Sequence, residues 1–406
     1  MPSMDSPLPE PHSNFKIAVV GSGPAGLMAA THLSADSGNE VHLFEKRSGL
    51  GRKLLIAGSS GLNISHHLEA EAFAKHYEGF TRATWKDTLA DFGTTHWIQF
   101  IEHELGLETF LGTSDRYFVR EMKASQLLKK WTELLRSRGV QIHSTQELVD
   151  FSSEREGISL TFNEGPAKRF ASAIFALGGA SWETETPAWA ELFRGKGIGM
   201  VPFSPRNVGY TVDWKPALLA EAEGKPLKKI RFESTQGSKS GELVITEYGL
   251  EGTPVYFYGE TGQCFIDLKP DLTLDQVTDK LKQVRENLSP IRRAKQKLAL
   301  SEAALALLFH HLPNEDRADL DRFARAVKRF PITLGSPRPL SEAISSSGGV
   351  ALSELTPDLE LKKFPGVYCG GEMLDWHAPT GGFLIQACVS MGTRIAKAVS
   401  HSARRI

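Results

Sequence analysis

The residues best suited to chemistry gather in glycine-rich segments near both ends of the chain. Near the N-terminus, Gly21-Ser22-Gly23-Pro24-Ala25-Gly26 matches the G-x-G-x-x-G pattern of dinucleotide-binding proteins. An apolar, β-branched run from Phe15 to Val20 precedes the glycines, and a small-residue helical stretch begins at Pro24. The pattern therefore predicts a strand, a tight turn and a helix whose N-terminus faces a pyrophosphate.

Each glycine of this turn has a separate predicted role. Gly21 makes the turn, Gly23 lets the backbone approach the pyrophosphate, and Gly26 lets the helix approach the strand. Glu45 ends the next predicted strand nineteen positions after Gly26, where a ribose hydroxyl needs an acceptor. An acidic residue there favours FAD or NAD over a 2′-phosphorylated dinucleotide, although Arg47 lies close enough to keep the phosphorylated form open.

A second glycine-rich loop helps to decide between FAD and NAD. The loop runs from Gly49 to Asn63 and carries the basic pair Arg52 and Lys53. Many FAD proteins also bind the cofactor through the segment at this place, so the loop indicates FAD. The alternative for the pair is a solvated surface location, which is usual for basic side chains.

Two further glycine pairs follow predicted elements near the C-terminus. Gly370-Gly371-Glu372 ends a strand with little side-chain bulk, so Glu372 would accept a hydrogen bond from a ribityl hydroxyl. Gly381-Gly382 opens a helix whose amides and positive dipole end would face the N1 and O2 edge of a flavin and favour its reduction. The alternative is a simple turn and helix cap.

The predicted FAD site thus draws on segments far apart in the sequence. Candidates for proton transfer are His377, Tyr248 and Lys53, although an isolated histidine such as His377 is more often a filler than an acid or base. The residues predicted to bind the cofactor are Gly21, Ser22, Gly23, Pro24, Ala25, Gly26, Glu45, Lys46, Arg52, Lys53, Leu54, Gly58, Asn63, Gly178, Gly371, Glu372, Thr380, Gly381, Gly382 and Phe383.

Composition and missing motifs exclude several other classes of protein. Lys+Arg 47 against Asp+Glu 48 leaves a net charge of −1, which argues against a dedicated nucleic-acid binder. The three cysteines form no C-x-x-C pair, the histidine pairs are adjacent in sequence, and no G-x-S-x-G is present. We therefore expect no disulfide framework, no metal site and no serine hydrolase. The chain also has no apolar run of membrane-spanning length and no signal peptide, so we expect a cytoplasmic protein without membrane contact.

The order of predicted elements indicates an α/β fold with an insertion. We expect a doubly wound, Rossmann-like FAD-binding domain built from residues 15–183 and 331–406, after a disordered tail over residues 1–14. Residues 184–330 read as an inserted lobe, β-rich and then helical, that caps the flavin. Residues 85–107, 121–138 and 381–400 carry helical periodicity.

Several of these segments together give the chain a specific resemblance. It resembles the bacterial BaiN/YhiN-type, or aminoacetone-oxidase-like, NAD(P)/FAD-dependent flavoproteins over most of its length. This resemblance implies FAD as cofactor, with Gly381-Gly382 in the second flavin-contact loop. The matching runs are residues 51–58 with Asn63, 116–125, 176–179, 241–252, 366–375 and 379–386.

This chain departs in two places from the family that it resembles. Many relatives carry Gly-Gly-Gly-Arg-Cys-Asn after the basic loop, whereas this chain has Gly58-Ser-Ser-Gly61-Leu62-Asn63. A Thr-His pair of many relatives is Thr246-Glu247 here. The resemblance therefore leaves the substrate open.

Three functions from different classes follow from these observations. The first is an FAD-dependent oxidoreductase, either a reductase or an oxidase, that exchanges a hydride with a small organic substrate. A second complete dinucleotide fingerprint is missing, so NAD(P)H as reductant would dock only transiently. The second is a flavin-dependent RNA-modifying enzyme, which the basic run from Lys225 to Arg231 keeps open, and the third is a non-catalytic flavin-binding sensor. The oligomeric state is left open.

Overall fold

A computed structural model describes residues 15–58, 61–112, 115–154, 157–284 and 287–403. The expected disordered tail, residues 1–14, lies outside these ranges. The chain forms two compact units. Unit 1 comprises residues 1–180, 185–203 and 347–406, and unit 2 comprises residues 181–184 and 204–346.

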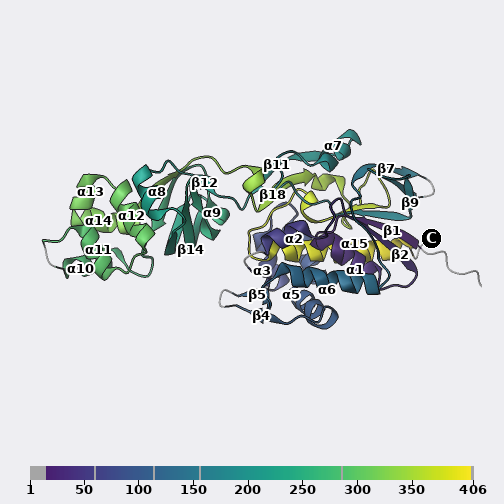
Figure 1. Cartoon of the computed structure of the whole chain (residues 1–406), viewed down its shortest axis with the longest axis horizontal. Helices are drawn as coiled ribbons and strands as arrows, with labels where there is room; N and C mark the ends of the chain where they lie inside the picture. The colour runs from purple at the N-terminus through teal and green to yellow at the C-terminus, as the bar shows by residue number, and fades with distance from the viewer. Residues whose placement is uncertain (1–14, 59–60, 113–114, 155–156, 285–286, 404–406) are drawn as a thin grey trace, which may run out of the picture. The chain divides into compact units, whose positions relative to one another are not determined.

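A five-stranded parallel sheet forms the centre of unit 1 (Figure 1). Its order is β19-β10-β1-β2-β6, with Val19 of β1 opposite Ile174 on one side and Leu43 on the other. Such apolar, β-branched strands suit a sheet that is covered on both faces. The predicted doubly wound α/β fold is confirmed, and its strands are β1 (Phe15–Val20), β2 (Asn39–Phe44), β6 (Gln141–His143), β10 (Ser172–Phe175) and β19 (Val367–Cys369).

The first and last helices of the chain pack side by side in unit 1 (Figure 1). Helix α1 (Pro24–Leu33) has proline in its first turn and buries eight of its residues, and helix α15 (Phe383–Ala403) lies against it. A Cβ atom on Gly392 of α15 would stand 2.3 Å from the carbonyl oxygen of Ala25. The close approach of the two helices therefore requires glycine at this position.

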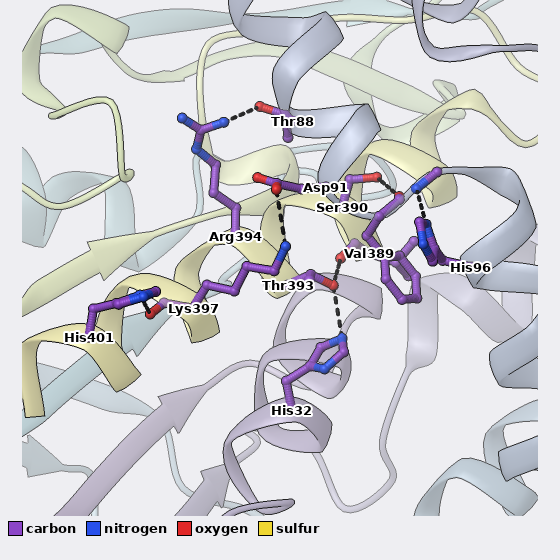
Figure 2. A network of polar contacts seen from close by, with 12 residues as sticks. His32, Thr88, Asp91, His96, Val389, Ser390, Thr393, Arg394, Lys397 and His401 are labelled. Carbon is purple, nitrogen blue, oxygen red and sulfur yellow. Dashed lines mark hydrogen bonds and ion pairs between the residues drawn. The ribbon is translucent and has the colours of Figure 1, made fainter. Parts of the chain in front are cut away.

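Polar contacts on the outer part of α15 hold it to α4 (Arg82–Asp91) (Figure 2). The Lys397 ammonium lies 3.0 Å from the Asp91 carboxylate, and the Arg394 guanidinium donates to the Thr88 hydroxyl over 3.2 Å. These contacts join the C-terminal helix to a segment about 300 residues earlier in the chain. The last helix is thus part of the core fold of unit 1.

His32 on α1 gives this helix packing a predicted pH dependence. Its Nε2 atom lies 3.0 Å from the Thr393 hydroxyl (Figure 2). Burial, together with the positive charges of Lys397 and Arg138, lowers the pKa of His32 from 6.5 to about 4. The folded state therefore keeps His32 neutral where the unfolded chain takes up a proton, so stability present above pH 6.5 is lost as the pH falls towards 4.

We expect His32→Gln to remove part of this acid sensitivity, because glutamine keeps a polar group without titrating. Between about pH 7 and pH 4.5, wild-type protein should lose on the order of 1–2 kcal/mol more stability than the variant. Denaturant unfolding at both pH values measures this difference. Equal losses in the two proteins would show that His32 does not set the acid limit.

Smaller elements surround the central sheet of unit 1. The predicted helical run 85–107 is broken at Phe92 and Gly93, because Phe92 adopts an extended ψ of 78° and ends α4. The two small sheets are β3 (Asn63–His66), β5 (Arg116–Val119), β4 (Thr109–Leu111) and β7 (Leu148–Glu154), β8 (Gly157–Phe162), β9 (Lys168–Phe170). The α-helices are α2 (Arg52–Ala57), α3 (Ala70–Phe73), α5 (Thr94–Gln99), α6 (Ala124–Ser137) and α7 (Ala188–Gly195). The short 3-10 helices are η1 (Ala74–His76), η4 (Leu352–Glu354) and η5 (Gly371–Met373), and η2 (Phe100–Glu104) is a π-helix.

Unit 2 has its own antiparallel sheet and its own hydrophobic core. The sheet order is β12-β15-β14-β13-β16-β17, and the helices of the unit lie between its strands in the sequence, most of them between β16 and β17. Its strands are β12 (Tyr210–Thr211), β13 (Pro226–Ser234), β14 (Gly237–Thr246), β15 (Gly249–Glu251), β16 (Gly262–Asp267) and β17 (Phe330–Leu334). Its helices are α8 (Pro216–Ala222), α9 (Thr253–Tyr258), α10 (Leu274–Lys282), α11 (Pro290–Lys297), α12 (Glu302–His311), α13 (Asn314–Ala318) and α14 (Leu320–Lys328), with the turn η3 (Leu340–Glu342).

The long segment of unit 2, residues 204–346, begins and ends further along the chain than the bounds 184 and 330 expected from the sequence. At the C-terminal edge, β17 pairs with β16 through Pro331 opposite Phe265, so residues after 330 complete the sheet of unit 2. The division between units falls within β11 (Met200–Arg206) and β18 (Ser345–Val350). Within the described ranges, no helix is both long and apolar enough to cross a membrane.

Candidate functional site

The turn after β1 shows what each of its glycines does. Gly21 has a φ of +106°, and a Cβ there would stand 2.2 Å from the carbonyl oxygen of Ala176. A Cβ on Gly26 would stand 1.9 Å from the carbonyl oxygen of Gly21. Gly23 has nothing within 4 Å of its Cβ position, which leaves open space at the N-terminus of α1. Two glycines thus allow close backbone packing, and the third leaves room for a ligand beside uncapped amides.

Four strands of the parallel sheet end in predicted site residues at the same edge. Gly21 follows β1, Glu45 follows β2, Gly178 comes shortly after β10, and Gly371 comes shortly after β19. The chain runs from β1 to β2 on one side and returns to β10 on the other, so the strand order reverses here. Ligands of doubly wound proteins bind in the crevice at such a reversal.

Glu45 is held by the two glycine-rich segments around it. One carboxylate oxygen accepts from the backbone N–H of Ser22 over 3.2 Å and from the Ser22 hydroxyl, and the other accepts from the N–H of Arg47 over 3.0 Å. The Ser22 hydroxyl also accepts from the N–H of Gly51 over 3.0 Å. The acid is therefore fixed beside the first turn, where a ribose would need it.

Lys53 lies within this edge of the sheet. Its ammonium donates to the carbonyl oxygen of Gly179 over 2.6 Å and lies 3.8 Å from the Cβ position of Gly178. It thereby ties α2 to the end of β10, 126 residues later. Its charge also acts on Glu372, whose pKa it lowers against the larger effect of burial.

The Glu372 carboxyl group lies in an environment that disfavours its charged form. Its Oε1 atom is buried and has no hydrogen-bond partner among the described residues. Burial raises the pKa of Glu372, and the Lys53 charge offsets part of the shift. Cys388 of α15, which the sequence did not single out, accepts a hydrogen bond from the backbone N–H of Glu372, and burial raises the pKa of its thiol. A buried helical cysteine carries no local signal that distinguishes it from core.

A second cluster surrounds the Gly381-Gly382 turn before α15. Gly382 has a φ of +93°, and a Cβ there would stand 2.6 Å from the backbone nitrogen of Ser65 and 2.8 Å from the Asn63 side-chain oxygen. Both polar atoms of the Asn63 amide are buried and lack a hydrogen-bond partner within the described part of the chain. An amide with a free donor and a free acceptor suits a ligand edge that alternates both, as the pyrimidine ring of FAD does.

Two basic side chains that the sequence did not single out as site residues lie beside Gly381. A Cβ on Gly381 would stand 3.2 Å from His66 Nε2 and 3.4 Å from Arg116 Nε. His66 and Arg116 face each other across the β3–β5 pair. Arg116 lies within one of the runs that carry the family resemblance, but nothing local marks it as a site residue.

The other predicted cofactor residues divide into exposed and packed groups. Lys46 and Arg52 are exposed, whereas Ala25, Leu54 and Phe383 are 3–5 % exposed and belong to the core. Pro24 starts α1, and Thr380 directly precedes the Gly381 turn. A Cβ on Gly58 would stand 2.4 Å from the Ala124 Cβ, so this glycine permits packing of the loop on α6.

The three catalytic candidates lie in different surroundings. Lys53 lies at the sheet edge described above. His377 is 9 % exposed, and its backbone forms a bridge with Glu78. Tyr248 belongs to unit 2, where it donates to Glu251 and lies under the Arg338 guanidinium, 4.3 Å from the ring centre. Burial and the Glu251 carboxylate raise the pKa of Tyr248.

Comparisons with known proteins agree with this geometry. The family model described as "HI0933-like protein Rossmann domain" matches residues 15–398. A 3-dehydro-bile acid delta(4,6)-reductase of Clostridium scindens is 24% identical over 415 residues, which cover 95% of this chain and 99% of that protein. The ribosomal RNA dihydrouridine synthase of Escherichia coli is 22% identical over 397 residues, which cover 92% of this chain and 94% of that protein.

Solved structures show the same fold. A 3-ketosteroid-delta4-(5alpha)-dehydrogenase of Rhodococcus jostii superposes with a TM-score of 0.51 at 11% identity, covering 95% of this chain and 97% of that one. The FrdA chain of Escherichia coli quinol fumarate reductase gives a TM-score of 0.51 at 14% identity, covering 96% of this chain and 71% of that one. The chain belongs to the HI0933-like (BaiN/YhiN) family of FAD-dependent oxidoreductases.

Proposed function

We propose that this oxidoreductase is a reductase that transfers a hydride from FAD to a conjugated double bond of a small organic substrate, with NAD(P)H as a transiently bound donor. The names of both curated relatives support reduction over oxidation. One relative is a delta(4,6)-reductase, and the other makes dihydrouridine, which has two hydrogens more than uridine. The bile acid relative favours a small organic substrate.

The observation that carries the proposal is the buried Asn63 amide beside the Gly382 turn. Burying both polar atoms of an amide without partners costs about 1–3 kcal/mol for each, and a bound ligand that pairs with both atoms would remove this cost. Bound FAD would supply the hydride chemistry. The amides of α1 and the Glu45 carboxylate would hold its dinucleotide part, Glu372 would accept from a ribityl hydroxyl, and Asn63 would orient the ring.

Reduction of a double bond also needs a proton, and the chain offers candidates for its donor. The Tyr248 hydroxyl is protonated at neutral pH, and its raised pKa means that it holds this proton more tightly than an ordinary tyrosine does. We keep Tyr248 and His377 as candidate donors and assign Lys53 to positioning, because its ammonium already binds the Gly179 carbonyl. Tyr248→Phe removes the hydroxyl and keeps the ring, so this variant tests whether the Tyr248 hydroxyl donates the proton.

The decisive experiment follows the flavin spectrum of the purified protein without oxygen. We expect FAD absorbance that NADH or NADPH bleaches quickly and that a conjugated enone, but not its saturated analogue, restores. Rapid restoration by air with no response to any enone would favour an oxidase. Protein that cannot be loaded with FAD would contradict the proposal.

An RNA substrate is the second candidate, and one relative supports it directly. The Escherichia coli relative acts on ribosomal RNA, and the match covers 94% of its length. In unit 2, the basic side chains of Lys228, Lys229 and Arg231 on β13 are exposed. The near-zero net charge of the chain weighs against strong binding of a polyanion.

Salt dependence tests this alternative. Specific binding of a ribosomal RNA fragment should weaken steeply with salt, and Lys228→Gln should reduce the slope by about one. Restoration of the bleached flavin by uridine-containing RNA, and not by enones, would make RNA the substrate. RNA affinity that changes neither with salt nor with Lys228→Gln would show that the basic side chains on β13 do not bind the RNA.

A further inference from the structure

Arg116 at the start of β5 is a half-buried cation. Among the described residues, its buried Nε atom has no hydrogen-bond partner and its guanidinium has no carboxylate as counter-charge. Burial lowers the pKa of the guanidinium, and no nearby charge offsets this effect. A buried guanidinium nitrogen normally has a hydrogen-bond partner, so the Nε atom of Arg116 is suited to an acceptor that a ligand would supply.

The backbone of Arg116 is held within a small sheet. Arg116 faces His66 across the antiparallel β3–β5 pair, and its carbonyl oxygen accepts from the N–H of Gly112 over 2.8 Å. The N–H of His67 donates to the carbonyl oxygen of Asp115 over 2.9 Å. Arg116 is therefore fixed within a sheet and is unlike an arginine on a loose surface loop.

The two glycines of the turn face different polar groups. The Cβ position of Gly382 faces Asn63 and Ser65, whereas that of Gly381 faces Arg116 and His66. Gly381 has a φ of +106° and carries no side chain, so the chain leaves the space 3.4 Å from Arg116 Nε unfilled at this point. An atom placed beside Gly381 would meet the guanidinium.

We propose that Arg116 is the counter-charge for an oxygen that becomes negative during the reaction beside Gly381. This inference rests on the proposed function, because that function supplies such an oxygen from two sources. One is the pyrimidine oxygen of FAD, on which charge increases when the ring is reduced. The other is the carbonyl oxygen of a conjugated substrate.

The chemistry of the substrate source balances with the hydride of reduced FAD, which would be left oxidised, and with one proton, both of which belong to the proposed function. Addition of a hydride forms a C–H bond at the β carbon and breaks the carbon–carbon π bond. The displaced electron pair moves to the carbonyl oxygen, and a proton then adds at the α carbon. A guanidinium facing that oxygen stabilises the charge where it develops, which is worth most in a site shielded from water.

The test compares FAD-loaded Arg116→Gln with Arg116→Lys and with Arg120→Gln. Arg120 is an apt control because it lies just beyond the other end of β5, is exposed and pairs with Glu108. FAD content and melting temperature show first that each protein is folded and loaded. The measurements are the flavin midpoint potential, the dissociation constant of sulfite, and the dissociation constants of cinnamate and neutral cinnamamide.

The two sources of the oxygen give different results. If the oxygen belongs to FAD, Arg116→Gln weakens sulfite binding at least tenfold and lowers the two-electron potential by about 30 mV, the equivalent of tenfold. If it belongs to the substrate, the potential stays constant, while cinnamate binding weakens at least tenfold and cinnamamide binding does not. Arg116→Lys should show a smaller loss than Arg116→Gln in either case, because lysine keeps the positive charge.

Either result supports the proposal and identifies the source. The proposal is overturned if Arg116→Gln matches wild-type protein in potential, sulfite affinity and cinnamate affinity, or if Arg120→Gln changes them equally. Failure of the proposed reductase function is distinguishable, because the potential and sulfite measurements need neither NAD(P)H nor turnover. Only wild-type protein that does not bind FAD would contradict both the proposed function and this inference.

Discussion

Alanine at Gly26 is expected to destabilise the protein even without FAD, whereas alanine at Gly23 is expected to weaken FAD binding alone. A Cβ on Gly26 would stand 1.9 Å from the carbonyl oxygen of Gly21, which real atoms cannot approach. Separating α1 from the strand to relieve this overlap should cost about 3 kcal/mol or more. At Gly23 the φ is −72° and nothing lies within 4 Å of the Cβ position, so alanine fits the polypeptide.

The two glycine variants therefore control for each other. Denaturant unfolding of FAD-free protein should show a large loss for Gly26→Ala and a change within about 0.5 kcal/mol for Gly23→Ala. Fluorescence titration with FAD should show at least a tenfold weaker affinity for Gly23→Ala, about 1.4 kcal/mol, because the added methyl occupies the approach to the α1 amides. Unchanged FAD affinity would place the dinucleotide away from this turn.

Glu372→Gln is expected to stabilise the FAD-free protein and to weaken FAD binding. Burial raises the pKa of Glu372, so the folded state holds its proton more tightly than the unfolded chain, whose group titrates near 4.5. As the pH rises above 4.5, the unfolded chain ionises freely, and the folded state pays for a buried charge. Glutamine has no such charge, so its advantage should appear above this pH and vanish below it.

Thermal unfolding and FAD titration separate the two effects of Glu372. We expect the FAD-free variant to melt roughly 2 °C higher than wild-type protein near neutral pH and at the same temperature below about pH 4. FAD affinity should fall at least tenfold, since a hydrogen bond to a charged acceptor contributes about 1.5–3 kcal/mol. Lys53→Met is a matched comparison, because removing the charge that lowers the Glu372 pKa should increase the destabilisation. A melting difference that does not change with pH would show that the pKa of Glu372 is the same in the folded and unfolded states.

Local patterns in the sequence were sufficient for the elements that bear the first half of the site. The strand β1, the glycine turn and α1 follow one another without a gap, and each has its own short-range signal in apolar runs, glycine spacing and the position of Pro24. The doubly wound class follows from such signals, because a strand, a helix and a parallel strand join in only one hand. The break of the predicted helical run 85–107 shows the limit, since Phe92 ends α4 although apolar periodicity continues.

The extent of unit 2 depended on pairing between distant strands. Nothing near Phe330 indicates that β17 pairs with β16 about 65 residues earlier, which extends unit 2 past the expected bound. Strand propensity shows that a segment is extended but does not identify its partner.

The sequence by itself determined the dinucleotide turn, the acidic residue after β2, the α/β class and the family, since each of these is recognised from short runs of neighbouring residues. Only the tertiary structure decided which distant groups meet. Lys53 reaches Gly179 across 126 residues, and Arg116 lies beside Gly381. Sequence periodicity describes which face of an element is apolar, whereas a site is made where faces of different elements converge.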